Sequence, residues 1–282
     1  MTQQARDHLG RFGIWRGERE VTPGLAASIE DLGFGALWLG SAHGGLAAAE
    51  EFLAATTTLT VATGIVNMWQ YEPHQVAASF QRVEERFPGR FLLGVGAGHP
   101  EVTQQYARPY DTLARYVDTL LDDGVPPGRL VLAALGPKVL RLAAQRAAGA
   151  HPYLVTPDYT AQAREILGPG PLLAPEQKAV LSTDPGQARA IGRSRVEKPY
   201  LGLANYTANL RRLGWTDADL SGGGSDALID ALVAHGSAAQ VVARLTEHLD
   251  AGADHVSIQL VTEPGADPAG GYRELAGAIK LR

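Results

Sequence analysis

Short runs of apolar residues alternate with longer amphipathic stretches along almost the whole chain. Most short runs are continuous rather than alternating, which is typical of strands that are covered on both faces. The pattern predicts eight strands, which are Arg11–Trp15, Ala36–Gly40, Leu59–Val66, Phe91–Val95, Leu130–Ala134, His151–Val155, Gln177–Ser182 and His255–Val261.

The stretches between these runs have the spacing of amphipathic helices. Thr22 before Pro23, and Thr156 before Pro157, combine a capping hydroxyl with a proline suited to the first helical position. The predicted helices are Pro23–Leu32, Leu46–Ala55, Pro73–Phe87, Pro109–Leu121, one from Pro137, one from Pro157 to about Gly168, one from Pro185, Asp226–Ala234, Ser237–Asp250 and Tyr272–Leu281.

A strand followed by a helix, repeated eight times, indicates a parallel sheet. Eight such units in about 280 residues predict an α/β fold of the (β/α)₈ TIM barrel type. We expect a single domain over residues 1–282, with an insertion after the seventh strand at about 199–224. The alternative is an open, doubly wound sheet.

Composition narrows the class of protein. The chain has 282 residues, a formal net charge of −5 and no run of five basic residues, so we expect no nucleic-acid partner. It has no cysteine, which excludes disulfides and thiol chemistry. The N-terminus lacks the apolar core of a signal peptide, and no apolar run is long enough to cross a membrane. We therefore expect a cytoplasmic protein with no membrane partner.

In a (β/α)₈ barrel the functional site forms at the carboxyl ends of the strands. Here these ends are rich in glycine, small polar residues and histidine. They lack paired carboxylates, which argues against a glycosidase. His43, His99 and His151 sit on different strands, and no His-x-His spacing or carboxylate partner supports a metal site, so we expect no metal.

Two glycine-containing strand ends are candidates for ligand contacts. Gly94, Gly96 and Gly98 do not have the spacing of the dinucleotide fingerprint. They indicate either tight packing or a flat ligand lying against the backbone. Gly136-Pro137-Lys138 opens a helix whose N-terminus suits a phosphate, and Lys138 is either part of that site or a solvated lysine.

Several stretches together resemble the luciferase-like flavin and deazaflavin oxidoreductases, and most of all their coenzyme F420-dependent branch. The most specific is Phe87–Gly98. The others are Glu30–Gly40, Leu59–Val66, Pro73–Ala78, Ala133–Lys138 and Tyr200–Gly214.

The resemblance implies a (β/α)₈ barrel, a homodimer and a cofactor ring at the strand ends. It also implies a non-prolyl cis peptide at Gly64–Ile65, in a bulge behind the ring. The expected cofactor is coenzyme F420, with FMN as the alternative. Its expected contacts are Ser41, Thr63, Gly64, Ile65, Asn67, Gly96, Gly98, Leu135, Gly136, Pro137, Lys138 and Tyr153.

His99 stands where several deazaflavin relatives carry a catalytic glutamate, so the resemblance implies that it transfers a substrate proton. The alternative is that it only binds the cofactor or packs beneath Pro100. The Asp-His pair of those relatives is replaced by Ser41-Ala42, and His43 is a second catalytic candidate. Trp69 follows the bulge and is expected to bind substrate, in preference to Trp15 and Trp38.

The function implied is hydride transfer between the deazaflavin C5 and a small organic substrate. Two alternatives remain at this point: an FMN-dependent monooxygenase, and a non-catalytic relative.

Overall fold

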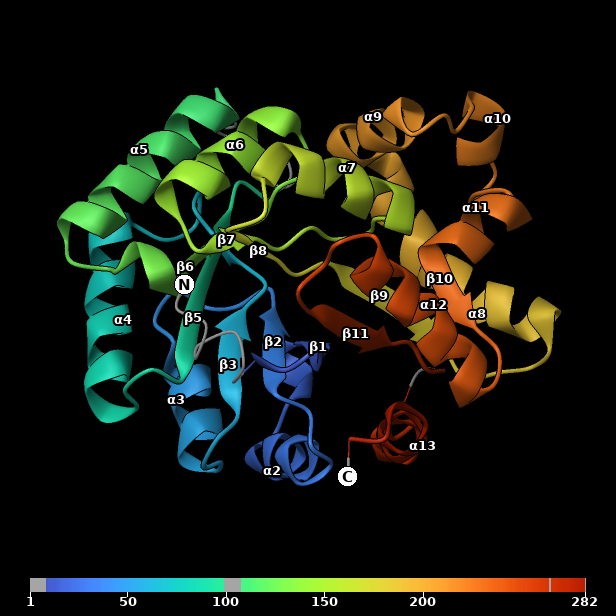
Figure 1. Ribbon diagram of the computed structural model, residues 1–282, viewed down its shortest axis with the longest axis horizontal. Coiled ribbons are helices and arrows are strands. Elements are labelled where there is room, and N and C mark those ends of the chain that lie inside the picture. The colour runs from blue at the N-terminus through green and yellow to red at the C-terminus, as the bar shows by residue number, and fades with distance from the viewer. Residues whose placement is uncertain (1–8, 99–107, 264, 282) are drawn as a thin grey trace.

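The computed structural model describes residues 9–98, 108–263 and 265–281 (Figure 1). Their strands form one sheet in which every pairing is parallel. The strands are β1 (Phe12–Gly17), β2 (Ala36–Gly40), β3 (Thr60–Thr63), β4 (Val66–Asn67), β5 (Phe91–Gly96), β6 (Leu130–Leu132), β7 (Gly149–Ala150), β8 (Leu172–Leu173), β9 (Glu176–Val180), β10 (Val233–His235) and β11 (Val256–Leu260).

The sheet closes on itself through the segment that holds β8 and β9. On one side β8 pairs with β7, and on the other side β9 pairs with β11. β11 in turn pairs with β1. The ring of strands confirms the (β/α)₈ barrel and excludes the open, doubly wound sheet.

Helices surround this ring (Figure 1). As expected, the hydroxyl of Thr22 accepts a hydrogen bond from the Leu25 N–H at 3.2 Å, and Thr156 caps the helix that begins at Pro157. The helices are α2 (Pro23–Asp31), α3 (Ala47–Ala54), α4 (Pro73–Arg86), α5 (Pro109–Asp122), α6 (Pro137–Arg146), α7 (Pro157–Leu167), α8 (Pro185–Glu197), α9 (Ala204–Arg212), α10 (Asp217–Leu220), α11 (Asp226–Leu232), α12 (Ala238–Asp250) and α13 (Ala269–Ile279).

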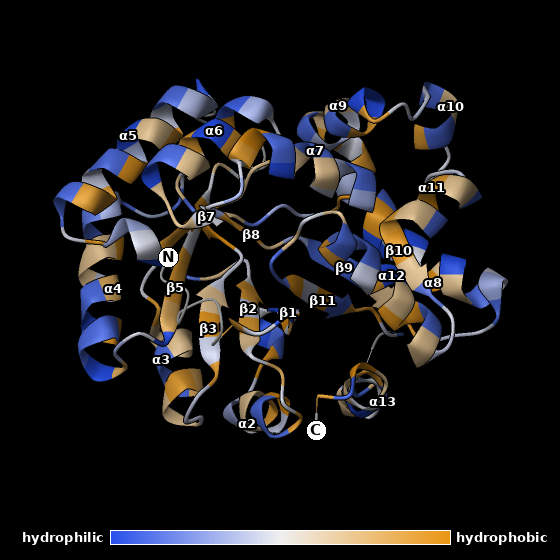
Figure 2. Ribbon diagram, in the orientation of Figure 1, coloured by the Kyte–Doolittle hydropathy of each residue, from blue (hydrophilic) through white to orange (hydrophobic). Residues whose placement is uncertain are grey.

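The largest core cluster lies between strands and helices. In Figure 2 β5 is largely hydrophobic, whereas β9 is largely hydrophilic. A smaller cluster joins Trp38 to alanines that include Ala36 of the same strand, Ala62 of β3 and Ala174 between β8 and β9. These small residues leave room for the fully buried indole of Trp38.

Several predicted elements are placed differently in the structure. The predicted third strand, Leu59–Val66, is interrupted between β3 and β4, and the closing helix begins at Ala269 rather than Tyr272. The sixth strand is Gly149–Ala150, and residues 151–155 form the loop that follows it. Gly149 must be glycine, because a Cβ there would lie 1.9 Å from the Leu172 carbonyl oxygen of the next strand. The seventh strand begins at Leu172 rather than Gln177, and the predicted helix 226–234 ends at Leu232 before β10.

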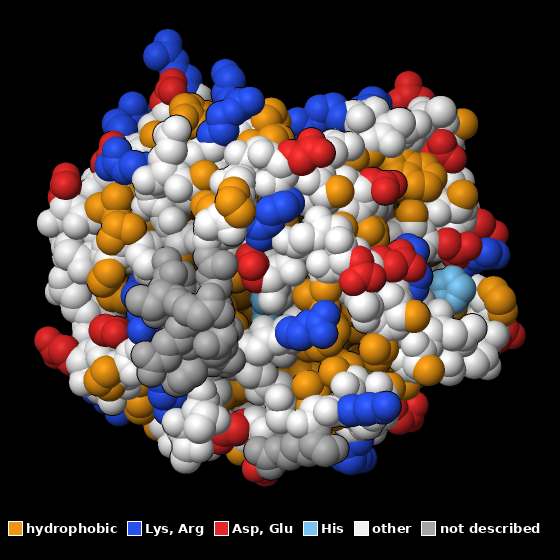
Figure 3. Space-filling model, in the orientation of Figure 1, with side chains coloured by type: hydrophobic (Ala, Val, Ile, Leu, Met, Phe, Trp, Pro, Cys, Tyr) orange, Lys and Arg blue, Asp and Glu red, His pale blue; other side chains and the backbone are white. Residues whose placement is uncertain are grey.

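The insertion predicted at 199–224 contains a 3₁₀ turn (Tyr200–Gly202) and the helices α9 and α10. Basic and acidic side chains are interspersed on the face shown in Figure 3. Within the described residues, no helix combines the length and apolarity needed to span a bilayer.

Candidate active site

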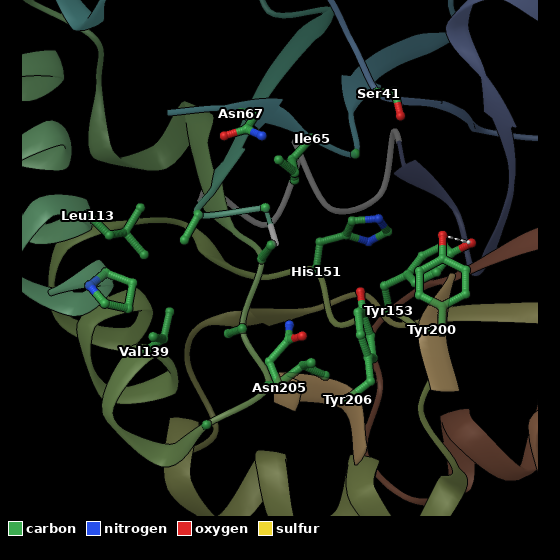
Figure 4. A pocket seen from close by; sticks show the side chains of 18 of the residues that line it. Ser41, Ile65, Asn67, Leu113, Val139, His151, Tyr153, Tyr200, Asn205 and Tyr206 are labelled. Atoms are coloured by element: carbon green, nitrogen blue, oxygen red, sulfur yellow. Dashed lines mark hydrogen bonds between the residues drawn. The ribbon is translucent and has the colours of Figure 1, made fainter. Parts of the chain in front are cut away.

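A cavity of about 550 Å³ lies at the carboxyl ends of the strands. Aliphatic Leu113 and Val139 lie on one side, and Tyr153, Tyr200 and Tyr206 lie on the other (Figure 4). None of the described residues that line the cavity is Asp, Glu, Lys or Arg. The lining also includes Trp15, Ser41, Ala42, Gly64, Ile65, Asn67, Gln70, Ala97, Gly98, Pro109, Tyr110, Ala133, Ala134, Leu135, Gly136, His151 and Asn205.

One wall of the cavity is the interruption between β3 and β4. The Gly64–Ile65 peptide is cis, as the resemblance implies. Before it, the buried hydroxyl of Thr63 donates to the Gly94 carbonyl at 2.8 Å and accepts from the Gly94 N–H at 2.7 Å. After it, Asn67 pairs with Gly96 of β5. The break therefore turns the backbone of residues 64 and 65 into the cavity while both flanks stay in the sheet.

The glycines of β5 are explained largely by contacts within the protein. A Cβ at Gly94 would lie 1.9 Å from the Thr63 carbonyl oxygen, and one at Gly96 would lie 2.8 Å from the Ala133 Cβ. Gly98 has a φ of +56°, and a Cβ there would lie 2.5 Å from the Asn67 amide nitrogen. Tight packing thus accounts for Gly94 and Gly96, whereas Gly98 and Asn67 both line the cavity.

His151 lies between the two sides of the cavity (Figure 4). Its Nδ1 is 2.7 Å from the Ala174 carbonyl oxygen, and its ring stacks on Trp38 with centroids 4.2 Å apart. Burial lowers the pKa of His151 to about 4, although its bond to Ala174 opposes this effect. The imidazole is therefore neutral at pH 7.

The aromatic side of the cavity is backed by a buried ion pair. Lys178 and Glu176 are both fully buried, with Nζ 3.2 Å from Oε1. Nζ also lies 3.8 Å from the centroid of the Tyr153 ring, and the Tyr200 hydroxyl donates to that of Tyr153 at 3.0 Å. Burial lowers the pKa of Lys178 and raises that of Glu176, while each charge opposes the shift of the other.

The N-terminus of α6 opens at the edge of the cavity. Gly136 is its N-cap and provides no side-chain capping bond. From the insertion, Arg212 donates through Nη2 to the Leu135 carbonyl at 3.1 Å and to Asn209 Oδ1 at 2.6 Å. A guanidinium, a helix N-terminus and a cavity therefore meet at residues 135 and 136, which suits an anionic group.

The structure brings eight of the twelve expected cofactor contacts together in the lining. Thr63 and Gly96 lie buried behind it, and Pro137 and exposed Lys138 lie beside it in the first turn of α6. These eight are Ser41, Gly64, Ile65, Asn67, Gly98, Leu135, Gly136 and Tyr153.

None of the residues expected to act in catalysis or to bind substrate is among the described lining residues. His99 lies outside the described residues. His43 is exposed beside the cavity, where its Nδ1 accepts from the Gly45 N–H at 3.0 Å and its ring contacts Tyr71. Trp69 packs against the core and is not among the described lining residues, whereas Trp15 is.

Sequence reasoning missed the cavity roles of His151, Asn205 and Tyr206. The apolar pattern places His151 in a strand, although the following Pro152 cannot donate to a sheet and indicates that the strand has ended. Asn205 and Tyr206 lie in the insertion, in helix α9. The N-cap of α9 is Leu203, which makes no side-chain capping bond, so the sequence does not signal where this helix begins.

Part of the sequence around this site resembles a known family. Residues 16–122 match the sequence model of a family described as luciferase-like monooxygenases. The 4-hydroxyprotoasukamycin monooxygenase of Streptomyces nodosus subsp. asukaensis is 30% identical over 106 residues. That match covers 34% of this chain and 29% of that enzyme, so it spans less than a third of the relative's length.

Solved structures match nearly the whole chain. An F420-dependent secondary alcohol dehydrogenase, in complex with an F420–acetone adduct, superposes with a TM-score of 0.76 at 16% identity, covering 96% of this chain and 98% of that one. The FMN-bound oxygenating constituent of 3,6-diketocamphane monooxygenase, from Pseudomonas putida, gives 0.65 at 14% identity, covering 94% and 95%. Residues 16–122 therefore resemble luciferase-like monooxygenases in sequence, and the whole chain shares its fold with an F420-dependent and an FMN-bound enzyme.

Proposed function

We propose that this chain is an oxidoreductase that uses coenzyme F420 to move a hydride to or from a small, uncharged organic substrate. The observation that carries the proposal is the cavity at the barrel mouth, which combines an uncharged lining with a cationic edge at Arg212. When bound, a deazaflavin supplies a ring carbon that gives or accepts a hydride.

The residues present fit such a cofactor. Gly64, Ile65 and Gly98 line one wall of the cavity, where the glycines present no side chain to a flat ring. Leu113 and Val139 supply an apolar wall. The cavity volume of about 550 Å³ lies within the range of small-molecule sites, which is roughly 300–1,000 Å³.

Ile65 and Asn67 would contact the ring, and the α6 N-terminus with Arg212 would hold a phosphate. Tyr153 and Tyr200 would exclude water from the reacting atoms. His99 follows Gly98 of the lining directly, and we propose it as the group that exchanges a proton with the substrate.

The second candidate is an FMN-dependent monooxygenase. The observation that favours it is the 30% identity to a monooxygenase over 106 residues. Both cofactors carry a phosphate, so the α6 site does not separate them.

A fluorescence titration of the purified protein with coenzyme F420 and with FMN tests the proposal. Micromolar binding of F420 together with weak FMN binding supports it. Tight binding of FMN alone would instead support the FMN-dependent monooxygenase. Binding of neither cofactor would support a non-catalytic relative.

The phosphate site has its own test. The Arg212→Gln variant should weaken binding of the phosphorylated cofactor roughly tenfold or more, since it removes a charged partner. It should leave the affinity for the same cofactor ring without its phosphate unchanged. Arg211→Gln is the matched control, because Arg211 pairs instead with Asp217 at 2.8 Å. Equal losses for both ligand forms would contradict a phosphate at this position.

A further inference from the structure

Two polar atoms without partners among the described residues lie beside Gly64. They are the indole nitrogen Nε1 of Trp15 and the imidazole nitrogen Nε2 of His151. A Cβ at Gly64 would lie 3.0 Å from the first and 2.9 Å from the second. The two atoms therefore flank a single point, and all three residues line the cavity.

The hydrogen-bonding character of each atom is fixed. The Nδ1 of His151 faces the Ala174 carbonyl oxygen, which only accepts, so the ring proton is on Nδ1. His151 Nε2 therefore carries a lone pair and is an acceptor. Trp15 Nε1–H can only donate. The cavity thus presents one acceptor and one donor side by side.

His151 cannot easily turn to another partner. Trp38 stacks on its ring at an interplanar angle of 15°, and the Trp38 N–H is itself bonded to His255 Nε2 at 3.0 Å. His255 is held in turn by the Gly10 carbonyl at 2.8 Å. Buried polar atoms are rarely left unpaired in native proteins, and such exceptions occur at functional sites.

We propose that Trp15 and His151 together bind one donor–acceptor group of an uncharged ligand. The ligand group donates a hydrogen bond to His151 Nε2 and accepts one from Trp15 Nε1–H. A hydroxyl does both with one oxygen, and the N–H and C=O edge of a ring imide does both with neighbouring atoms. The hydroxyl would belong to the substrate and the imide edge to the cofactor ring, so the identity of these ligands rests on the proposed function.

The direct test is an NMR titration of protein labelled with ¹⁵N at tryptophan and histidine. The Trp15 indole signal is assigned by its loss in Trp15→Phe. The ligands are coenzyme F420, then cyclohexanol added to the cofactor-loaded protein, and then methoxycyclohexane in its place. The ether accepts a hydrogen bond but cannot donate one.

We expect the Trp15 indole proton and the His151 Nε2 signal to shift together. A shift on addition of F420 alone assigns the pair to the ring edge. A shift only with cyclohexanol, and a much smaller one with methoxycyclohexane, assigns it to a substrate hydroxyl. Equal shifts with the alcohol and the ether, or unmoved signals, would overturn the proposal and leave the pair bridged by water only.

Binding measurements give a second readout. Trp15→Phe keeps an aromatic ring but removes the donor. It should lower the affinity for the ligand that shifts the signals by about tenfold. Trp215→Phe, in the insertion and outside the described lining, is the control. If neither F420 nor FMN binds, cyclohexanol is titrated into the protein without cofactor; a shift of both signals then means that the proposed function fails while the paired site stands.

Discussion

At the scale of single residues, Gly94 shows how closely β3 and β5 approach each other. Its N–H and carbonyl both bond to the Thr63 hydroxyl, and the Thr63 carbonyl lies where a side chain would start. Gly64, where the strand is interrupted, is the next residue after Thr63. The packing of Gly94 therefore holds the end of β3 in place directly before the cavity wall begins.

We therefore expect Gly94→Ala to lower the free energy of unfolding by about 3 kcal/mol, because the added methyl meets backbone atoms that cannot move aside. Urea denaturation followed by circular dichroism measures this effect. Gly277→Ala is the matched control, since Gly277 lies in α13 with no atom near its Cβ position. The control should stabilise the protein slightly, and an unchanged midpoint for Gly94→Ala would contradict the packing argument.

At the scale of elements, the insertion packs over a charged strand. β9 directs Glu176 and Lys178 to the same side, and the rings of Tyr153 and Tyr200 cover the ammonium group. Glu176 also accepts the Leu154 N–H at 3.1 Å. The ion pair therefore ties β9 to the loop after β7 and to the 3₁₀ turn of the insertion.

Removing one partner should be costly, because the other remains as an uncompensated buried charge. We expect Lys178→Met to lower the free energy of unfolding by about 3–5 kcal/mol. Adding Glu176→Gln should recover part of that loss, since the amide oxygen can still accept from Leu154. Lys138→Met, at an exposed site, serves as the control in the same urea series. A double variant no more stable than Lys178→Met would show that the charge is not the cause.

At the scale of the whole molecule, three histidines are buried in the neutral form. Burial lowers the pKa of His151 and of His255 to about 4, and that of His248 to about 3. In the unfolded chain each returns to about 6.5. Below pH 6.5 the unfolded state therefore binds more protons than the folded state, and acid favours unfolding.

The stability of the protein should accordingly be fully present above pH 7 and fall as the pH drops from 6.5 towards 4.5. The loss is about 2 kcal/mol for each histidine over that range. Urea midpoints at several pH values measure it. His248→Gln should flatten the dependence, whereas His43→Gln, at an exposed site, should not. A stability that does not change between pH 7 and 5 would contradict the neutral buried state.

Much of this architecture is predictable from sequence because its signals are local. Continuous apolar runs and Thr-Pro helix starts locate most strands and helices, and the family resemblance identifies the cis peptide. The short strands β7 and β10 are not predictable in this way, because pairing with distant residues defines them. For the same reason His151 and Trp15 meet at Gly64 only in the folded barrel.

The anchoring of the insertion has one more consequence. α8 enters it after packing on β9, and β10 returns from it to pair with the same strand. The segment between them contributes Tyr200, Asn205 and Tyr206 to the cavity but no strand to the closed ring. A change within this segment could therefore reshape one side of the cavity without breaking any strand pairing of the closed ring.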